Sequence, residues 1–320
     1  MTKVSTAKDA IAKIVDPELR ATLERLQATL EQSPWRKEVE EFKTQAIKKL
    51  PTAEQQIFSF LPHQLAKTSI FFPMSDRQLK EENRLISKIE HETGWGKVVI
   101  EGIKLAIFEE DVLLALLSLL KDNPASVRAE ASLKININDI VNILYGERGY
   151  SKRNEDVILN TLNHFQLVSF RLIQGDWQKR GKERLKVEMI RSIGNIISAY
   201  NYDTETKALK IYFNPHFLAF FLESMLTTIS LTLRRQLKKD GSKALLRFLE
   251  AHTNPGSMHI LTILNAINYN VDQPMSELRR RFKSFIAELK KHGILGKKTR
   301  LSSNDIVYFD IQAPKKLLPV

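Results

Sequence analysis

The stretch Ser276–Ser303, SELRRRFKSFIAELKKHGILGKKTRLSS, combines many guanidinium and ammonium groups with a regular apolar pattern. Its apolar residues recur at the spacing of one helix face: Leu278, Phe282, Phe285, Ile286 and Leu289. The opposite face and its flanks carry cationic, polar or small side chains: Ser276, Arg279, Arg280, Arg281, Lys283, Ser284, Ala287 and Lys291. An arginine can bond both acceptors of guanine in the major groove, and short Ser and Ala side chains let a helix approach the bases. The pattern predicts a DNA-reading helix, with a solvated charged surface as the alternative.

Further cations flank this predicted helix on both sides. After it, a short turn carries Lys297, Lys298 and Arg300, which suit a wing that touches the DNA backbone or the minor groove. Before it, a basic stretch carries candidates for phosphate contacts, some of which could equally be solvated surface charges: Arg234, Arg235, Lys238, Lys239 and Lys243.

The groups that usually perform enzyme chemistry are not arranged for it. TGWGK, at Thr93–Lys97, lacks both the first Gly and the final Ser or Thr of a phosphate-binding loop. No His-x-His pair and no Gly-x-Ser-x-Gly motif occurs. Glu109, Glu110 and Asp111 begin an apolar helix, where acidic residues complement the helix dipole. We therefore predict no enzyme activity, no catalytic residues, no metal and no cofactor.

The charge of the chain is distributed unevenly along its 320 residues. Residues 1–150 hold 21 Lys and Arg against 22 Asp and Glu, whereas residues 151–320 hold 28 against 15. This excess of positive charge in the second half indicates a polyanionic partner, either nucleic acid or an anionic membrane surface. The cations lie on predicted helices and hairpins that also carry apolar core residues, which favours nucleic acid. The apolar run Phe217–Leu233 is too short for a membrane span and predicts a buried helix.

The elements that would position these cations occur twice in the same order. The first set is a helix at 109–121, a short helix near 138–146, a longer helix from Ser151 and a β-hairpin formed by LVSFRLI and RLKVEMIRSI. The second set opens with a strand, ALKIYFNP, and a long basic helix, and it ends with the arginine-rich helix and a second hairpin. Helix, turn, helix and hairpin is the order of a winged helix-turn-helix.

These observations predict an α+β, mostly helical fold of two tandem winged-helix domains behind an N-terminal helical arm. The arm and hinge would span residues 1–60, the first winged-helix domain 61–202 and the second 203–320. The first domain would contribute phosphate contacts through its helix and through its hairpin, which serves as the wing, and is a candidate for dimerisation. The residues expected to make these contacts are Lys152, Arg153, Asn160, Asn163, Lys179, Arg180, Lys182 and Arg184. Asp156 on the same helix repels phosphate, so the second domain would supply more of the base reading.

Four blocks of the chain resemble the TrfA/RepA-type replication initiators of broad-host-range plasmids. They are LPHQLAKTSIFF, VVIEGIKLAIFEEDVLLALLSLL, LKIYFNPHFLAFF and the stretch from Leu231 to Ile294. Together they lie within residues 61–311, and their order and spacing are more specific than any one block. The resemblance implies two winged-helix domains that bind repeated origin sites, called iterons, in double-stranded DNA and help to melt the origin.

The same resemblance implies partners and a cellular setting. The partners would be the host replicative helicase, the sliding clamp and a second copy of the chain in a dimer–monomer equilibrium, in the bacterial cytoplasm with a plasmid and no membrane. The family's clamp-binding pentapeptide has its nearest match in QIFSF, Gln56–Phe60, which has Ser at the fourth position. A hydrophobic edge docked on the domain is the other interpretation of this segment. The alternative function is a winged-helix transcriptional repressor, including one that represses its own promoter.

Overall fold

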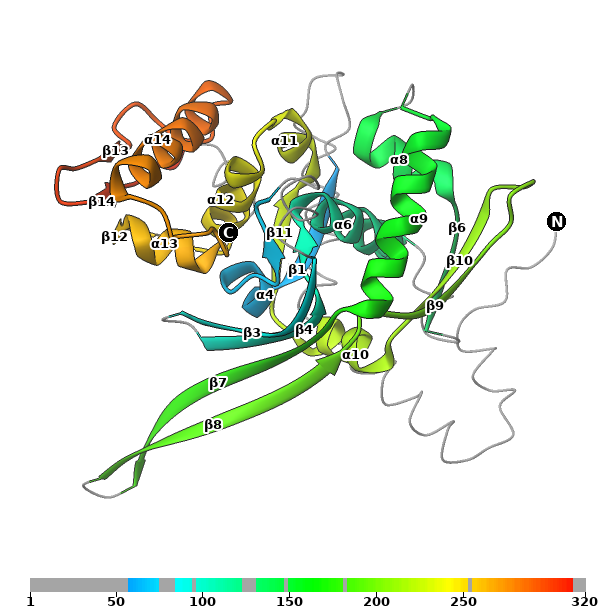
Figure 1. The fold of residues 1–320 in the computed structure, drawn as a ribbon, viewed down its shortest axis with the longest axis horizontal. Coiled ribbons are helices and arrows are strands. Elements are labelled where there is room, and N and C mark those ends of the chain that lie inside the picture. The colour runs from blue at the N-terminus through cyan, green and yellow to red at the C-terminus, as the bar shows by residue number, and fades with distance from the viewer. Residues whose placement is uncertain are drawn as a thin grey trace, which may run out of the picture.

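The structure is a computed structural model that describes residues 57–74, 84–93, 96–122, 131–146, 149–180, 183–252 and 255–312 (Figure 1). The predicted N-terminal arm, residues 1–60, lies outside these ranges except for its last four residues.

The first unit, residues 107–213, contains three helices and a three-stranded antiparallel sheet (Figure 1). Its elements are α6 (Ile107–Asp122), β6 (Ser132–Asn136), α8 (Ile137–Tyr145), α9 (Lys152–Leu167), β9 (Ile197–Tyr202) and β10 (Ala208–Phe213). The strand order is β6-β10-β9, so the last strand lies in the middle. Apart from the segment between α9 and β9, this is the layout of a winged helix in which β9 and β10 form the wing.

The second unit, residues 240–308, repeats that layout. Its elements are α12 (Asp240–Glu250), β12 (Ser257–His259), α13 (Ile260–Ala266), α14 (Met275–Lys291), β13 (Arg300–Leu301) and β14 (Ile306–Tyr308). The strand order is β12-β14-β13, which again places the last strand between the first and the second. The two units therefore agree in element order and also in strand pairing.

The prediction of one long basic helix ahead of the arginine-rich helix is wrong. The chain instead forms α10 (Pro215–Glu223), β11 (Leu226–Ser230) and α11 (Leu231–Gln236) before α12 begins. A residue of the arginine-rich helix stabilises the break between α11 and α12. The Glu288 carboxylate accepts hydrogen bonds from the backbone N–H groups of Lys238 at 2.8 Å and Lys239 at 3.3 Å. The apolar run Phe217–Leu233 is consequently split between helix, strand and helix.

The hairpin predicted as the wing of the first domain exists but belongs to another sheet. β7 (Ser169–Arg180) and β8 (Glu183–Gly194) extend the pair β3 (Leu85–Thr93) and β4 (Gly96–Ile103), in the order β3-β4-β7-β8. Apolar residues meet across the β4–β7 pair, with Val98 opposite Leu172 and Ile100 opposite Phe170, and this match favours the pairing. With sheets of this extent the fold is mixed α and β rather than mostly helical.

Strand β10 corrects the predicted start of the second domain at residue 203. It pairs with β6, with Leu209 opposite Ile135 and Ile211 opposite Leu133. Leu133, Leu209 and Ile211 are buried, so the pairing contributes to the core of the first unit. A boundary between residues 202 and 203 would cut through this three-stranded sheet.

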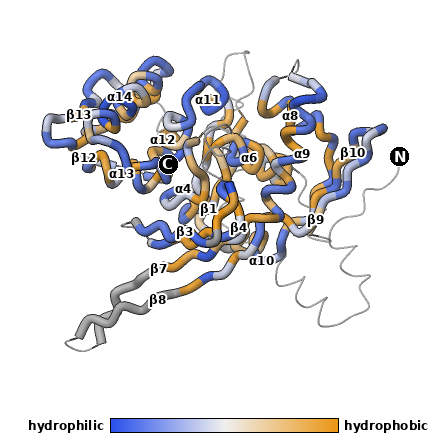
Figure 2. The backbone as a smooth tube through the Cα atoms, in the orientation of Figure 1, coloured by the Kyte–Doolittle hydropathy of each residue, from blue (hydrophilic) through white to orange (hydrophobic). Residues whose placement is uncertain are grey.

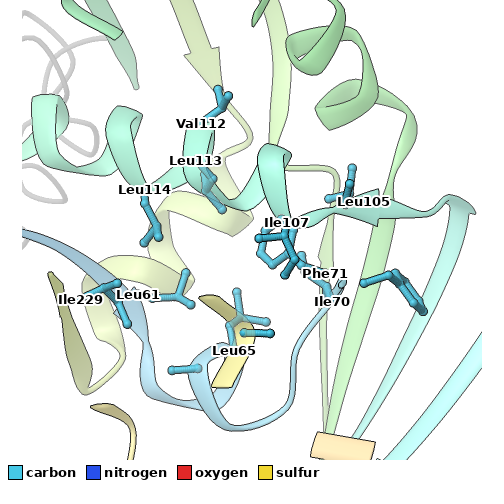
Figure 3. Close-up of a cluster of buried hydrophobic side chains, with 14 of the residues drawn as sticks. Leu61, Leu65, Ile70, Phe71, Leu105, Ile107, Val112, Leu113, Leu114 and Ile229 are labelled. Atoms are coloured by element: carbon cyan, nitrogen blue, oxygen red, sulfur yellow. The ribbon is translucent and has the colours of Figure 1, made fainter. Parts of the chain in front are cut away.

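One continuous hydrophobic core contains buried residues of both units, and Figure 3 shows the part of it around Leu61 and Leu114. At its centre, β1 (Phe58–Pro62) pairs with β11, and Leu61 and Ile229 face Leu114 of α6. The helix α4 (His63–Lys67) and the parallel pair β2 (Phe71–Phe72) and β5 (Leu105–Ala106) add further apolar residues to the cluster. Figure 2 shows hydrophobic residues gathered around β1 and α6 and hydrophilic ones along the outer parts of the second unit near β13.

A buried network of ion pairs crosses from α6 to α11 and α12. Glu110 accepts from Arg247 at 2.6 Å and pairs with Arg234 at 2.9 Å, and all three side chains have at most 1% of their surface exposed. Asp111 pairs with Arg234 and, at 2.5 Å, with Lys243. Buried charges are tolerated only when they are paired, so these pairs hold the first unit and the second unit in one arrangement.

Gly241 allows α12 to lie close against α14. A Cβ atom at this position would lie 2.2 Å from the Phe285 ring, well inside van der Waals contact. We expect Gly241→Ala to lower the free energy of unfolding by about 1–3 kcal/mol through overpacking, although alanine by itself favours a helix. Urea denaturation would measure the change. Lys283→Ala, an exposed helical control, should change stability by less than about 0.5 kcal/mol; an equally small effect of Gly241→Ala would mean that the ring moves aside freely.

Candidate nucleic-acid interface

A proline and a glycine mark the two ends of helix α14. Pro274 precedes its first residue, and Gly293 follows it with a φ of 70°. The N–H of Ile294 bonds the carbonyl of Leu289 at 3.0 Å, and the N–H of Gly293 bonds that of Lys290 at 3.0 Å. These two bonds are the Schellman motif, which needs a left-handed residue and therefore favours glycine.

The two faces of α14 separate as predicted. The buried residues of the helix are the five of the apolar stripe: Leu278, Phe282, Phe285, Ile286 and Leu289. On the other side, the residues classed as exposed are Ser276, Arg280, Lys283, Ala287 and Lys291, and those of intermediate exposure are Arg279, Arg281 and Ser284. Burial of the stripe fixes the rotation of the helix, so the cationic face is presented to the outside.

The three consecutive arginines of α14 each pair with a carboxylate. Arg280 donates to both oxygens of Glu277, at 2.7 and 2.6 Å, and Arg281 donates to one of them at 2.6 Å. These hydrogen bonds lower the pKa of Glu277 to about 2, so its carboxylate is charged at neutral pH. Arg279 instead reaches the turn between β13 and β14, where it donates to both oxygens of Asp305. This last pair ties the start of the helix to the hairpin.

The hairpin of the second unit carries its cations beside an aromatic ring. Lys297, Lys298 and Arg300 are exposed, as a wing requires. The Arg300 guanidinium lies over the ring of Tyr308, 5.0 Å from the ring centre, and the same residues line an open hollow with Phe309 and Asp310. A guanidinium stacked on an aromatic face keeps its charge while losing freedom of movement.

The five cations predicted ahead of the helix fall into two groups. The prediction that Arg234 contacts phosphate is wrong, because its guanidinium is buried against Glu110 and Asp111; Lys243 is likewise engaged by Asp111. The exposed cations of the set are Arg235, Lys238 and Lys239. Lys239 donates through its ammonium group to the Ser284 carbonyl at 3.2 Å, which places it beside the outward face of α14.

Helix α9 presents a face of nearly balanced charge. Lys152, Arg153, Asn160 and Asn163 are exposed, as predicted. Lys152 pairs with Asp156 at 3.1 Å and with the buried Glu155 at 2.5 Å. Burial opposes ionisation of Glu155, but its hydrogen bonds, that from Lys152 the largest, lower its pKa to about 2.

The cations predicted for the wing of the first domain do not lie in the turn between β9 and β10. Lys179, Arg180 and Arg184 belong to the strands β7 and β8, and Lys182 lies outside the described residues. The turn between β9 and β10, which is the wing of the first unit, is acidic instead. There Asp203 accepts hydrogen bonds from the backbone N–H groups of Glu205 at 2.8 Å and Thr206 at 3.2 Å. The turn holds Asp203 and Glu205 against one cation, Lys207, which pairs with Glu155 at 3.2 Å, so it carries no excess of positive charge for phosphate.

Sequence reasoning missed the partners of the interface arginines. The spacing of Glu277 to Arg280 and Arg281, three and four residues, was a readable signal for helical ion pairs. Asp305 and Tyr308 carry no such local signal, because they meet Arg279 and Arg300 only after the hairpin folds back.

Among the described residues, no group of three or more His, Asp or Glu side chains is placed to hold a metal ion. None of the helices in that part of the chain has the length and hydrophobicity needed to cross a lipid bilayer.

Comparison with known families identifies the first unit. Residues 100–250 match the family described as "Initiator Replication protein, WH1". These residues belong to the replication initiators. The match contains all of the first unit together with α11 and α12, so the winged-helix layout described above is that of an initiator. No curated protein matches the chain.

Two solved structures are loosely similar to this chain. The structure of domains 2 and 3 of RctB, a selenomethionine derivative, covers 72% of this chain and 92% of its own length, with 12% identity and a TM-score of 0.47. The Pi initiator protein in complex with iteron DNA covers 82% of this chain and 100% of its own length, with 15% identity and a TM-score of 0.34.

Proposed function

We propose that this replication initiator acts on a plasmid, binds repeated origin sites (iterons) in double-stranded DNA, helps to melt the origin and recruits host replication proteins, without enzyme activity of its own. The observation that carries DNA binding is α14, whose apolar stripe is buried while its cationic face stays exposed beside a cationic hairpin. A helix held in this way can enter a major groove while the hairpin reaches the adjacent backbone.

The two units would share the work of binding as tandem winged-helix domains behind an N-terminal arm. We place the boundary between them after α10, because β10 pairs with β6 of the first unit. The second unit would read bases through Arg280 and Lys283, with phosphates held by Arg235, Lys238 and the wing. The first unit would add fewer contacts, because α9 is nearly balanced in charge and its wing is acidic. Together they would span successive major grooves on one face of the DNA.

The proposed partners other than DNA rest on the family resemblance and not on a binding site in the structure. Recruitment of the host helicase and sliding clamp, and a dimer–monomer equilibrium, belong to the proposal on that ground and would place the chain in the bacterial cytoplasm. The pentapeptide-like segment Gln56–Phe60 is a poor candidate for clamp binding in this conformation. Its residues 58–60 form β1 and pair with β11, and Ser59 is buried and donates to the Leu114 carbonyl at 2.6 Å.

Salt dependence tests the electrostatic part of the proposal. If roughly 6–10 phosphates are neutralised, log affinity should fall linearly with log salt, with a slope of about −0.9 per phosphate. Fluorescence anisotropy with a labelled duplex at several salt concentrations would measure the slope. A slope near zero would contradict a nucleic-acid interface on this chain.

Strand opening separates an initiator from a repressor with the same domains. The wild-type chain should protect tandem repeats of its origin from nuclease, and it should make thymines in an adjacent AT-rich tract reactive to permanganate. A repressor would protect its site without producing reactive thymines. Protection of repeats with no opening, in the presence of host replication proteins, would therefore favour repression.

A further inference from the structure

Glu277 lies in the first turn of α14, the turn that would approach the bases in the proposed mode of binding. Its two carboxylate oxygens accept three hydrogen bonds, two from Arg280 and one from Arg281. The Glu277 side chain is 30% exposed, whereas that of Arg280 is 70% exposed. The carboxylate is therefore set back toward the helix, and the guanidinium that it holds projects outward.

The geometry of the pair leaves one edge of Arg280 available. The guanidinium has five N–H donors in a planar fork. Glu277 uses the edge formed by Nε and Nη2, at 2.7 and 2.6 Å. The outer edge, formed by Nη1 and the second hydrogen of Nη2, keeps two parallel donors. Two parallel donors match O6 and N7 of guanine.

Holding Arg280 in this way has two effects on binding. The side chain loses less freedom when it meets a base, which favours the correct base. The carboxylate also places a negative charge near the DNA backbone, which weakens binding to every sequence. The first effect increases the ratio of specific to non-specific binding, whereas the second lowers the affinity for both and so keeps binding to random DNA weak.

We propose that Glu277 is a positioning residue for base recognition, which directs Arg280 end-on toward a guanine and disfavours random DNA. The inference rests on the proposed function, because it requires α14 to enter a major groove. An ordinary ion pair within a helix is the competing interpretation. Such a pair would stabilise the helix slightly and would have no effect on base preference.

The test compares variants of the full chain on sequences that the wild-type chain selects from a random duplex library. The variants are Glu277→Gln, Arg280→Ala, their double variant and Glu205→Gln. Gln keeps the size of Glu and one acceptor oxygen, but it removes the charge and the two-oxygen clamp. Glu205→Gln removes one exposed negative charge from the wing of the first unit and so controls for net charge alone. Thermal melts would verify that each variant is folded.

The expected result is a loss of discrimination at one G·C pair. Arg280→Ala should reduce preference at that pair by about fivefold or more, as for the loss of a bidentate contact. Glu277→Gln should reduce preference at the same pair and tighten binding to random duplex, and the double variant should be no less selective there than Arg280→Ala. Glu205→Gln should leave base preference unchanged.

Two outcomes have separate meanings. If Glu277→Gln tightens binding to all duplexes equally with its base preferences intact, Glu277 is an ordinary ion-pair partner and the inference is overturned. If the wild-type chain selects no sequence from the library, the proposed function fails, and the inference fails with it for a different and recognisable reason.

Discussion

Replacement of Arg247 by Leu is expected to lower the free energy of unfolding by about 3–5 kcal/mol. The substitution removes a hydrogen bond of 2.6 Å to the Glu110 carboxylate, which is fully buried. Glu110 would keep its pair with Arg234, at 2.9 Å, but that guanidinium is already shared with Asp111. Because the Glu110 side chain is fully buried, water cannot replace the lost hydrogen bond, and loss of one partner from a buried ion-pair network is costly.

Urea denaturation followed by circular dichroism would measure this effect. The matched control is Arg171→Leu, because Arg171 pairs with Glu101 at a similar distance, 2.6 Å, but both side chains are about 40% exposed. Exposed pairs contribute about 0–1 kcal/mol. Similar losses for Arg171→Leu and Arg247→Leu would show that burial of the network does not matter to stability.

The same variant tests whether the network holds the two units together. Glu110 and Asp111 lie on α6 of the first unit, whereas Arg247 lies on α12 of the second. Because one hydrophobic core also joins the units, the wild-type chain should unfold in a single transition. Weakening the ion pairs should reduce the coupling between the units, so that each unit unfolds according to its own stability. A second unfolding transition in Arg247→Leu would reveal this.

Loss of both Arg280 and Lys283 is expected to reduce affinity for the selected site by well over tenfold. Both residues are proposed to read bases, and removal of a base-reading side chain costs about 1–3 kcal/mol. Both side chains are exposed and the apolar stripe is intact in the double variant, so its stability should change by less than about 0.5 kcal/mol for each substitution.

Binding to the selected and to a scrambled duplex, measured beside thermal melts, separates three possibilities. A base-reading role predicts a loss confined largely to the selected duplex, and a phosphate-binding role predicts equal losses on both. Unchanged affinity for both would mean that this face of α14 is only a solvated charged surface. Phe285→Ala provides the stability control, because it deletes a buried ring of the stripe and should cost about 3–5 kcal/mol of unfolding free energy.

The sequence by itself determined the local features of the interface. The spacing of Leu278, Phe282 and Phe285 specified which face of α14 is buried, because helical periodicity is a property of neighbouring residues. The stop at Gly293 was equally readable, because a left-handed residue after a helix is a local requirement. For the same reason the β7–β8 hairpin was predicted from its own turn and its flanking apolar residues.

Only the tertiary structure decided which sheet that hairpin joins and which charges remain available. The sequence of a strand does not identify the strand with which it pairs. Val98 and Ile100 of β4 lie some 70 residues before their partners in β7. Arg234 and Lys238 are alike in sequence as cations of one basic stretch, yet Arg234 is buried and Lys238 is exposed. The difference is the presence of two carboxylates on α6, more than 100 residues earlier, and burial among distant partners cannot be read from local spacing.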